Sequence, residues 1–375
     1  MDKTKKKSQQ FKDSEIFESA AEAAEFDYQG KKTHIAQPLV MVPVIRGKAI
    51  RGYGLLNLRR LRKAGKMGAN SKIEWTESTW NPVVGCSKVS SGCANCYAEK
   101  MAYRLACMGI SKYSIVTQPN KIVRGGEWNG LIHYDSTDLE TPLHWKKPRK
   151  IFVCSMGDLF HEDVPFDFID KVFGVIALCP QHTFMLLTKR PERMEQYFED
   201  RSFNDVLTNL MKEHGSERAW SKSWLNKLAG RYALTEKWAL DGYESKLRLP
   251  ESWPLPNVIG MTTVCNQEEA DKNIPILLNC KFARRGISVE PMLEEIEIPF
   301  IGWEGLIRWV IVGCESGSHR RECKIEWVRS IVQQCQAASV PVFVKQLDIG
   351  GRLVKDVSQF PEDLKIREFP MESKK

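Results

Sequence analysis

The sequence contains no long apolar run. No stretch approaches the roughly 18 continuous apolar residues that a membrane-spanning helix requires, and no apolar secretory segment precedes the cysteines. The 11 cysteines are scattered over 375 residues, and several lie in apolar runs: Cys154, Cys179, Cys265 and Cys280. We therefore expect a reduced, cytoplasmic protein that makes no membrane contact.

Acidic residues are absent from residues 31–66, which hold ten basic ones. Residues 1–66 carry 15 Lys/Arg and 7 Asp/Glu, whereas residues 67–375 carry 40 of each, so the whole net charge of +8 belongs to this leader. Its end, GLLNLRRLRKAGKM, predicts a basic amphipathic helix that could contact phosphates of a nucleic acid. The alternative is a mobile extension upstream of a module that begins at Met67.

The sequence also lacks a compact nucleophile motif, so an ordinary barrel-type hydrolase ranks lowest among the candidate functions. What it does contain is three cysteines in one turn-rich stretch, Cys86, Cys93 and Cys96 in TWNPVVGCSKVSSGCANCYAEK. Three thiolates can hold an iron–sulfur cluster and leave one iron free for chemistry. The Gly/Ser-rich loop can wrap a compact inorganic group, and a predicted helix after Cys96 favours an anionic ligand at its start.

Two other interpretations of these cysteines stay open. The two residues between Cys93 and Cys96 are also the commonest spacing in zinc knuckles, and Cys107 could complete a four-cysteine structural site. Against zinc, Cys107 falls eleven residues after Cys96 on the predicted helix, and no CxxC or HxxxH pair occurs elsewhere. The thiols could also be incidental.

From Ile73 onward, strand-like and helix-like segments alternate, which predicts an α/β fold with a parallel sheet covered by helices. The expected strands are residues 150–156, 182–189, 257–264, 283–290, 307–315 and 341–347, and the expected helices between them cover 166–179, 191–200, 267–280 and 324–337. We predict a barrel or partial barrel over residues 67–350, with a Trp- and Lys-rich helical insertion at about 200–250 and a C-terminal tail at 351–375.

Polar residues follow each expected strand, where reactive groups collect in such folds. They are Ser155, Asp158, His161 and Glu162; Thr188, Lys189 and Arg190; Asn266 and Gln267; Ser288 and Glu290; Glu315 and Ser316; and Lys345 and Gln346. Six polar strand ends in succession predict one shared cavity with charged and hydrogen-bonding walls. Singly, Asp158 could instead cap a turn, and Lys189 could be a solvated loop charge.

Several motifs recur in order from about Ile73 to Leu347. They are IEWTESTWNPVVGC, GCANCYAEKMA, GGEWNG, SMGDLFHEDVP, FMLLTKRPERM, ISVEPML and WVIVGCESG. With these motifs the chain resembles the uncharacterised phage-associated "gene product thirty-seven" family, whose members resemble radical S-adenosylmethionine (radical SAM) enzymes. The resemblance does not cover residues 1–66.

The resemblance implies a radical-SAM-like partial (β/α) barrel of about six parallel strands. It implies that Cys86, Cys93 and Cys96 hold a 4Fe-4S cluster whose fourth iron binds S-adenosylmethionine. It further implies a cofactor site or substrate site at the strand ends, formed by Ser155, Asp158, Lys189, Glu290, Glu315 and Ser316. Six residues separate the first two cysteines here, where the usual radical SAM motif has three.

The sequence thus leads to two hypotheses from different classes. The first is a phage-type radical SAM enzyme that modifies or repairs a nucleotide or nucleic acid, working with a protein partner encoded nearby. The second is a non-catalytic, nucleic-acid-associated protein in which the same cysteines hold structural zinc and the basic leader contacts phosphates.

Overall fold

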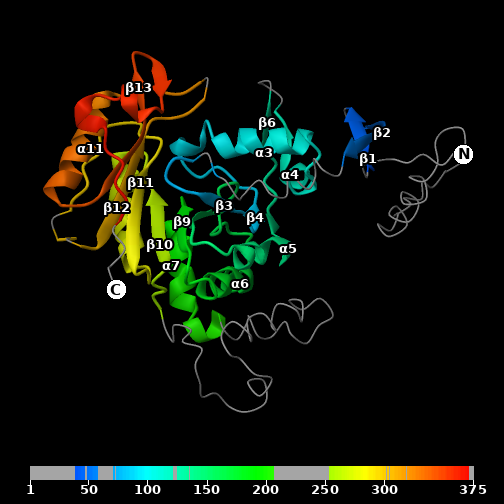
Figure 1. The fold of residues 1–375 in the computed structure, drawn as a ribbon, viewed down its shortest axis with the longest axis horizontal. Helices are drawn as coiled ribbons and strands as arrows, with labels where there is room; N and C mark the ends of the chain where they lie inside the picture. Colours follow the sequence, from blue (N-terminus) through cyan, green and yellow to red (C-terminus); the bar gives the residue numbers. More distant parts are fainter. Residues whose placement is uncertain are drawn as a thin grey trace, which may run out of the picture. The chain divides into compact units, whose positions relative to one another are not determined.

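The computed structural model describes residues 39–46, 49–57, 71, 73–120, 125–134, 136–206, 253–300, 302–303, 305–317 and 319–370. The chain divides into two compact units, Met1–Met67 and Gly68–Lys375. In the first unit, β1 (Leu39–Arg46) and β2 (Ala49–Asn57) form an antiparallel hairpin. The second unit carries the remaining described elements, including the three-cysteine loop (Figure 1).

The hairpin corrects one prediction for the leader. The amphipathic helix was expected from Gly54 onward, but residues 54–57 belong to β2, where Gly54 pairs with Val42 and Asn57 with Leu39. Pairing with a neighbouring strand satisfies the backbone here, and it overrides a weak helical periodicity. The rest of that segment, residues 58–66, lies outside the described residues. Residues 207–250 of the predicted insertion also lie outside them.

An eight-stranded, mostly parallel sheet forms the centre of Gly68–Lys375, which confirms the predicted α/β class. Its strand order is β14-β13-β12-β11-β10-β9-β8-β3, and each neighbouring pair is parallel except β13 and β14. The strands are β3 (Ser78–Trp80), β8 (Lys150–Val153), β9 (Thr183–Thr188), β10 (Val258–Thr263), β11 (Arg284–Val289), β12 (Ile307–Gly313), β13 (Val342–Ile349) and β14 (Arg352–Val354). Within the described residues, edge strands β3 and β14 do not pair, so the sheet is open there.

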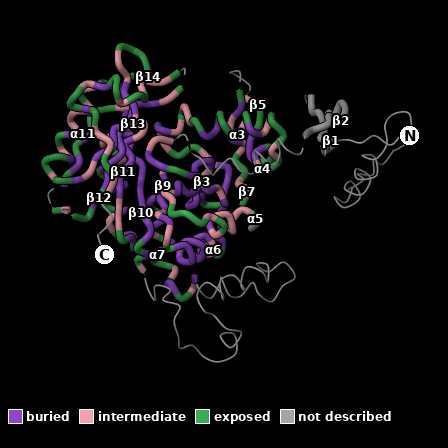
Figure 2. Tube along the Cα trace, in the orientation of Figure 1, coloured by how far each residue is buried: buried purple, intermediate pink, exposed green. Residues whose placement is uncertain are grey.

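Four helices cover one face of this sheet: α6 (Phe166–Ala177), α7 (Pro191–Asp200), α10 (Gln267–Asn279) and α11 (Ile325–Ala337). Most of their buried apolar residues join one large core with alternate strand residues such as Phe184 and Leu186. The other face of the strands carries a smaller cluster that includes Met185, Ile259 and Trp309. Figure 2 shows the strands as the buried centre of this unit.

This one-sided covering follows from the strand order. Strands β8 to β13 follow one another across the sheet without reversal, so right-handed crossovers all pass over the same face. Helix starts are also set locally. Pro191 occupies the first position of α7, and the side chain of Asn266 caps α10 by accepting from the N–H of Glu269 at 2.8 Å.

The long connection between β3 and β8 builds a smaller lobe of short elements. They are β4 (Val83–Val84), the 3-10 turn η2 (Ser91–Cys93), α3 (Tyr97–Cys107), α4 (Ser111–Val116), β5 (Thr117–Pro119), β6 (Gly126–Trp128), β7 (His133–Tyr134), α5 (Ser136–Leu139) and η3 (Thr141–His144). Strand β4 pairs with β7, and β5 with β6. Each helix in the described residues is too short or too polar to span a bilayer.

The C-terminal residues, which the sequence analysis assigned to a tail, pack on the sheet. Strand β14 pairs with β13, and η6 (Val357–Gln359) and η7 (Glu362–Leu364) follow it. Phe360 and Leu364 are buried in the main core, while Phe369 packs against Trp309 on the opposite face. Removal of these three apolar side chains from water favours packing of the segment on the sheet. Residues 371–375 lie outside the described residues.

Candidate functional site

The three-cysteine loop begins beside the end of β8. Gly85, which precedes Cys86, forms a parallel bridge with Gly157 and donates its N–H to the carbonyl of Met156 at 3.1 Å. Gly85 has a φ of +97°, and a side chain there would meet the carbonyl oxygen of Leu131 at 2.5 Å. Glycine is therefore required at this turn, and it sets Cys86 next to the residues that follow β8.

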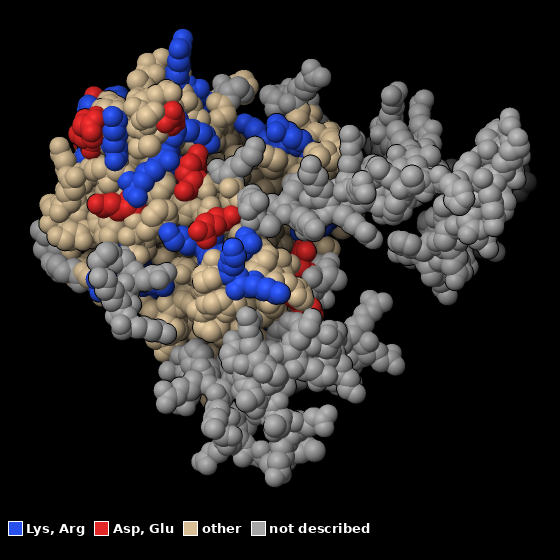
Figure 3. Space-filling view, viewed as in Figure 1, with Lys and Arg blue, Asp and Glu red and all other residues tan. Residues whose placement is uncertain are grey.

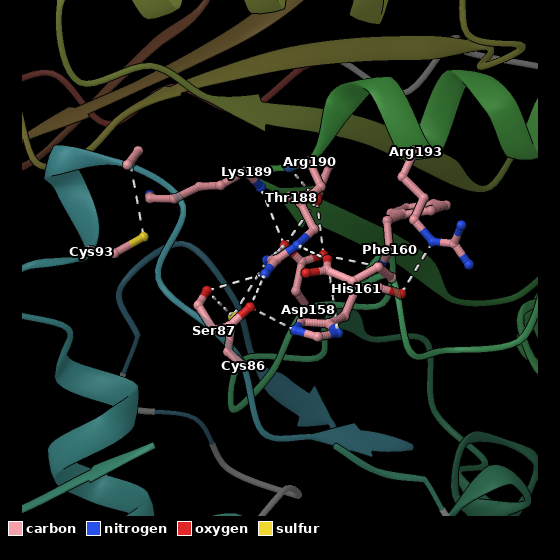
Figure 4. Close-up of polar contacts among 12 residues, drawn as sticks. Cys86, Ser87, Cys93, Asp158, Phe160, His161, Thr188, Lys189, Arg190 and Arg193 are labelled. Atoms are coloured by element: carbon pink, nitrogen blue, oxygen red, sulfur yellow. Dashed lines mark hydrogen bonds and ion pairs between the residues drawn. The ribbon is translucent and has the colours of Figure 1, made fainter. Parts of the chain in front are cut away.

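Arg190, at the end of β9, links the loop to Asp158. Its Nη1 donates to Oδ2 of Asp158 at 3.2 Å and to Sγ of Cys86 at 3.5 Å, while its Nη2 donates to both oxygens of Ser87 (Figure 4). Both side chains of the Arg190–Asp158 ion pair are only 7% exposed. Arg190 thus holds the first cysteine in a fixed place relative to the sheet.

The charges around Arg190 act on the neighbouring titratable groups. Burial and the Asp158 carboxylate raise the pKa of the Cys86 thiol to about 12, although Arg190 acts to lower it. Burial acts to lower the pKa of Arg190, but the Asp158 carboxylate, Cys86 and the hydrogen bond to Glu162 together outweigh this effect, so that pKa is raised. At neutral pH the metal-free site therefore combines a protonated Cys86 thiol with a permanent guanidinium charge.

Asp158 is fully occupied by this arrangement. Its Oδ1 accepts from the N–H of Phe160 at 3.0 Å and from the hydroxyl of Thr188 at 2.8 Å, and its Oδ2 faces Arg190. The Asp158 side chain is buried, and both oxygens already have protein donors. Its position therefore favours orienting Arg190, whereas the sequence predicted contact with a cofactor.

Cys93 lies on the turn η2, which packs against the ends of β9 and β10. The neighbouring Gly92 leaves no space for a side chain, because a Cβ there would lie 2.3 Å from Sγ of Cys265 and 3.4 Å from Cε of Lys189. Lys189 extends towards the turn that carries Cys93 (Figure 4). Burial raises the pKa of Cys265 to about 12, and the Lys189 ammonium acts in the opposite direction.

Cys96 is the N-cap residue of α3 and is half-buried. Burial raises its pKa, while the backbone N–H groups of Glu99 and Ala98 act to lower it. The charge of Cys93 also contributes to the raised pKa of Cys96, and the charge of Cys96 to that of Cys86, so the three thiols are electrostatic neighbours. A negatively charged group bound to Cys96 would lie at the positive end of the helix.

The far side of the loop is anchored at the end of β12. Nδ2 of Asn95 donates to Oε2 of Glu315 at 3.0 Å and to the carbonyl of His319 at 2.9 Å. Glu315 is 4% exposed and is also bound by Arg321. Burial acts to raise the pKa of Glu315, but hydrogen bonds from Arg321 and Asn95 prevail, so its pKa is lowered.

The other predicted site residues also lie at strand ends. The carbonyl of Ser155 accepts from the Tyr97 hydroxyl at 3.0 Å, which ties α3 to the end of β8. Glu290 forms an ion pair with Lys345 at 2.9 Å, and its carbonyl faces Sγ of Cys265. Ser316 is half-buried beside Glu315. The loop therefore crosses the carboxyl ends of β8, β9, β10 and β12.

A cavity of about 890 Å³ adjoins the loop. Its wall is formed by Ser90 and Ser91 of the loop, Lys189 at the end of β9, and the first turns of α7 and α10. The charges of Glu192 and Lys272 are paired at 2.6 Å on this wall. Lys189 has no carboxylate within ion-pair distance in the part of the chain that the structure describes, so its ammonium is available to an anionic group.

The donor set fits an iron–sulfur cluster better than a single ion. In the described residues, no three His, Cys, Asp or Glu side chains come close enough together to hold one metal ion. A cluster needs wider spacing, because its irons and sulfides separate the protein ligands. The loop offers three half-buried thiols on a Gly/Ser-rich backbone and an N–H donor aimed at Cys86 Sγ, which are groups that a cluster would use.

Two contributors to the site were not among the residues proposed for it from the sequence. They are Asn95, which lies between two of the cysteines, and Cys265, which was noted only as one of several cysteines in apolar runs. For Cys265 the available signal was position, since it directly follows a predicted parallel strand, as the proposed residue Arg190 does.

One family model, described as "Protein of unknown function (DUF5131)", matches residues 70–363. That range contains the three-cysteine loop, the strands of the sheet and each of the predicted site residues. No curated protein and no solved structure matches the chain.

Proposed function

We propose that this chain, which belongs to the DUF5131 family, is a radical SAM enzyme that holds a 4Fe-4S cluster on Cys86, Cys93 and Cys96. Its substrate would be a nucleotide or a nucleic acid. The observation that carries the proposal is the three-thiol loop fixed across the ends of four parallel strands, with Arg190 donating to Cys86 Sγ. Hydrogen bonds to ligand sulfurs are one of the means by which proteins tune such clusters.

The fold supports this proposal as a partial (β/α) barrel. Strands β8 to β13 follow one another without reversal, and α6, α7, α10 and α11 all lie on one face. In a barrel, a sheet of this kind curves around the face opposite its helices, and ligands bind at its carboxyl end. The three-cysteine loop lies at that end.

Each residue can be given a role that uses its observed surroundings. Lys189, at the cavity wall, would bind the carboxylate of S-adenosylmethionine. Asp158 orients Arg190, and Arg190 holds Cys86. Glu315, through Asn95, fixes the loop at its second end. When bound and reduced, the cluster and S-adenosylmethionine together would supply hydrogen-atom abstraction from a substrate. Glu290 and Ser316 are the remaining candidates for contact with cofactor or substrate.

The contact between Ser87 and His161 does not support a hydrolase. Nε2 of His161 lies 2.8 Å from the Ser87 hydroxyl, but Nδ1 of His161 accepts the N–H of Asp163. Burial and Arg190 hold the pKa of His161 below its ordinary value, so the ring is neutral at pH 7. Its single proton must then sit on Nε2 and be donated to Ser87, which is the wrong tautomer for a general base.

The zinc alternative lacks its expected fourth ligand. Cys107 is exposed at the opposite end of α3 from Cys96, and eleven residues of helix place the two about 16 Å apart along the axis. Cys107 therefore cannot share one metal ion with Cys96. On the face in Figure 3, acidic and basic side chains of the described residues are interspersed, with no large single-sign patch that would favour a nucleic-acid surface there.

The test is the metal content of anaerobically purified protein. We expect a brown protein that contains iron and sulfide and, once reduced, converts S-adenosylmethionine to 5′-deoxyadenosine. Cys86→Ala, Cys93→Ala and Cys96→Ala should each lose the iron, whereas Cys107→Ala and Cys154→Ala should keep it. Equal iron in all five variants, or a colourless zinc protein, would refute the cluster. A brown protein that neither binds nor cleaves S-adenosylmethionine would refute the radical mechanism alone.

A further inference from the structure

A fourth thiol lies against the three-cysteine loop. Cys265 follows β10, is fully buried, and its Sγ is the atom nearest to the place that a Gly92 side chain would occupy, at 2.3 Å from that Cβ position. Sγ of Cys265 is thus in direct contact with the residue next to Cys93. Cys107, the fourth cysteine that the sequence suggested, is excluded by the length of α3.

Cys265 is held firmly in this place. Its backbone N–H donates to Oε2 of Glu269 at 2.8 Å, and its carbonyl accepts from the N–H of Leu293 at 3.0 Å. Its thiol points to the carbonyl of Glu290 at 3.8 Å, a weak contact for a sulfur donor. Binding a metal would therefore break only this weak contact, with the metal displacing the thiol proton.

A cation lies beside Gly92 and acts against the effect of burial and of Glu269 on the Cys265 thiol. Cε of Lys189 lies 3.4 Å from the same Cβ position, so Lys189 and Cys265 approach the loop side by side. No carboxylate pairs with Lys189 among the described residues. An adjacent ammonium offsets part of the negative charge that a thiolate would add in this buried place.

We propose that Cys265 is the fourth thiolate ligand of the cluster on Cys86, Cys93 and Cys96 in the cofactor-free protein. The inference rests on the proposed function. In this state, Cys265 would occupy the ligand position that S-adenosylmethionine takes when it binds, and the Cys265 thiolate would take up a proton once it is released. Without the cofactor, the cluster would have no free ligand position. Binding of S-adenosylmethionine would replace Cys265 at that position.

The proposal makes Gly92 a determinant of the state in which Cys265 binds the cluster. A side chain at this position must push the turn η2 away from Cys265, because 2.3 Å is far below any real contact distance. Gly92→Ala would then separate the loop from the fourth thiol without removing a sulfur atom. Ser91, the preceding residue on the same turn, is exposed and offers a matched control.

The experiment compares wild type, Cys265→Ala and Gly92→Ala, each loaded with iron and sulfide without oxygen. Cys280→Ala is the control for the loss of a buried sulfur, because Cys280 is equally buried but lies at the other end of α10. Samples are treated with a mild oxidant, and iron loss and the electron paramagnetic resonance signal of a three-iron cluster are measured. Far-ultraviolet circular dichroism checks that each variant is folded.

We expect Cys265→Ala and Gly92→Ala to lose about a quarter of their iron on oxidation and to show the three-iron signal. Wild type, Ser91→Ala and Cys280→Ala should keep their iron. Equal iron loss in Cys265→Ala and wild type would overturn the role of Cys265 and leave the proposed function standing. A wild-type protein that takes up no iron would overturn both.

Discussion

Replacing Asp158 with asparagine tests how the site is held together. Asparagine keeps the shape of the side chain and an oxygen that can still accept from Phe160 and Thr188. It removes the negative charge opposite Arg190, whose side chain is 7% exposed. Arg190 would then be a buried cation without its buried partner, and its hold on Cys86 should weaken with it.

The expected cost follows from the burial of the pair. Removing one partner of a buried ion pair destabilises a protein by about 3–5 kcal/mol. Glu162 stays 2.9 Å from Arg190, but its side chain is 60% exposed and solvent screens its charge. We therefore expect Asp158→Asn to cost about 3 kcal/mol, or roughly a hundredfold in the folding equilibrium.

The assay is urea unfolding of the metal-free protein, followed by circular dichroism, together with iron content after anaerobic loading. Asp163→Asn is the control, because Asp163 lies on the same connection and its side chain is 63% exposed. We expect Asp158→Asn to lower both the unfolding midpoint and the iron content. If the two variants agree within about 0.5 kcal/mol, Arg190 does not depend on Asp158 and the reasoning is wrong.

Three further predictions concern pH, thiol reactivity and the leader. Glu315 has a lowered pKa in the folded protein, so its charge stabilises the fold above the unfolded value of about 4.3, and this contribution is lost as pH falls through the lower folded value. Glu315→Gln should then lower the urea midpoint at neutral pH and flatten its fall in acid; parallel curves for variant and wild type would contradict this. In metal-free protein below pH 9, a rise of the Cys86 pKa from 9.0 to about 12 should lower its thiolate fraction, and with it its alkylation rate, about a thousandfold; the exposed Cys107 is followed beside it by peptide mass spectrometry and should alkylate much faster. Similar rates would show that Cys86 is not buried as described. Deletion of residues 1–66 should weaken nucleic-acid binding and reduce its salt dependence without changing iron content; unchanged isotherms at low and high salt would remove that role.

The sheet was predictable because its strands are buried on both faces. The six expected strands at 150–156, 182–189, 257–264, 283–290, 307–315 and 341–347 contain or overlap β8 to β13. Continuous apolar runs mark such strands. The sequence did not predict β3, because Ser78–Trp80 is three residues long and mostly polar. The sequence did not predict β14, because it is a three-residue edge strand whose residues are exposed or only partly buried.

The sequence could indicate where the candidate site residues lie, but not which role each of them has. Polar residues after parallel strands must meet at one edge, and Ser155, Asp158, Lys189 and Glu315 do lie along the loop. Sequence order cannot say which of them faces a ligand and which faces another side chain. The contacts that each side chain makes depend on its burial. Asp158 is buried, and a buried carboxylate needs a partner of opposite charge, which here is Arg190.

The wide separation in sequence between the loop and its anchors also determines when the site can form. Cys86 and Arg190 are 104 residues apart, and Asn95 reaches Glu315 and His319 across 220 and 224 residues. During synthesis the cysteines emerge first, while the strand end that fixes the loop's second half is made last. Contacts of such high sequence separation form late in folding. We therefore expect a nascent chain to expose these thiols until β12 has been made and has docked, and a metal group that needs the anchored loop to be loaded only after that step.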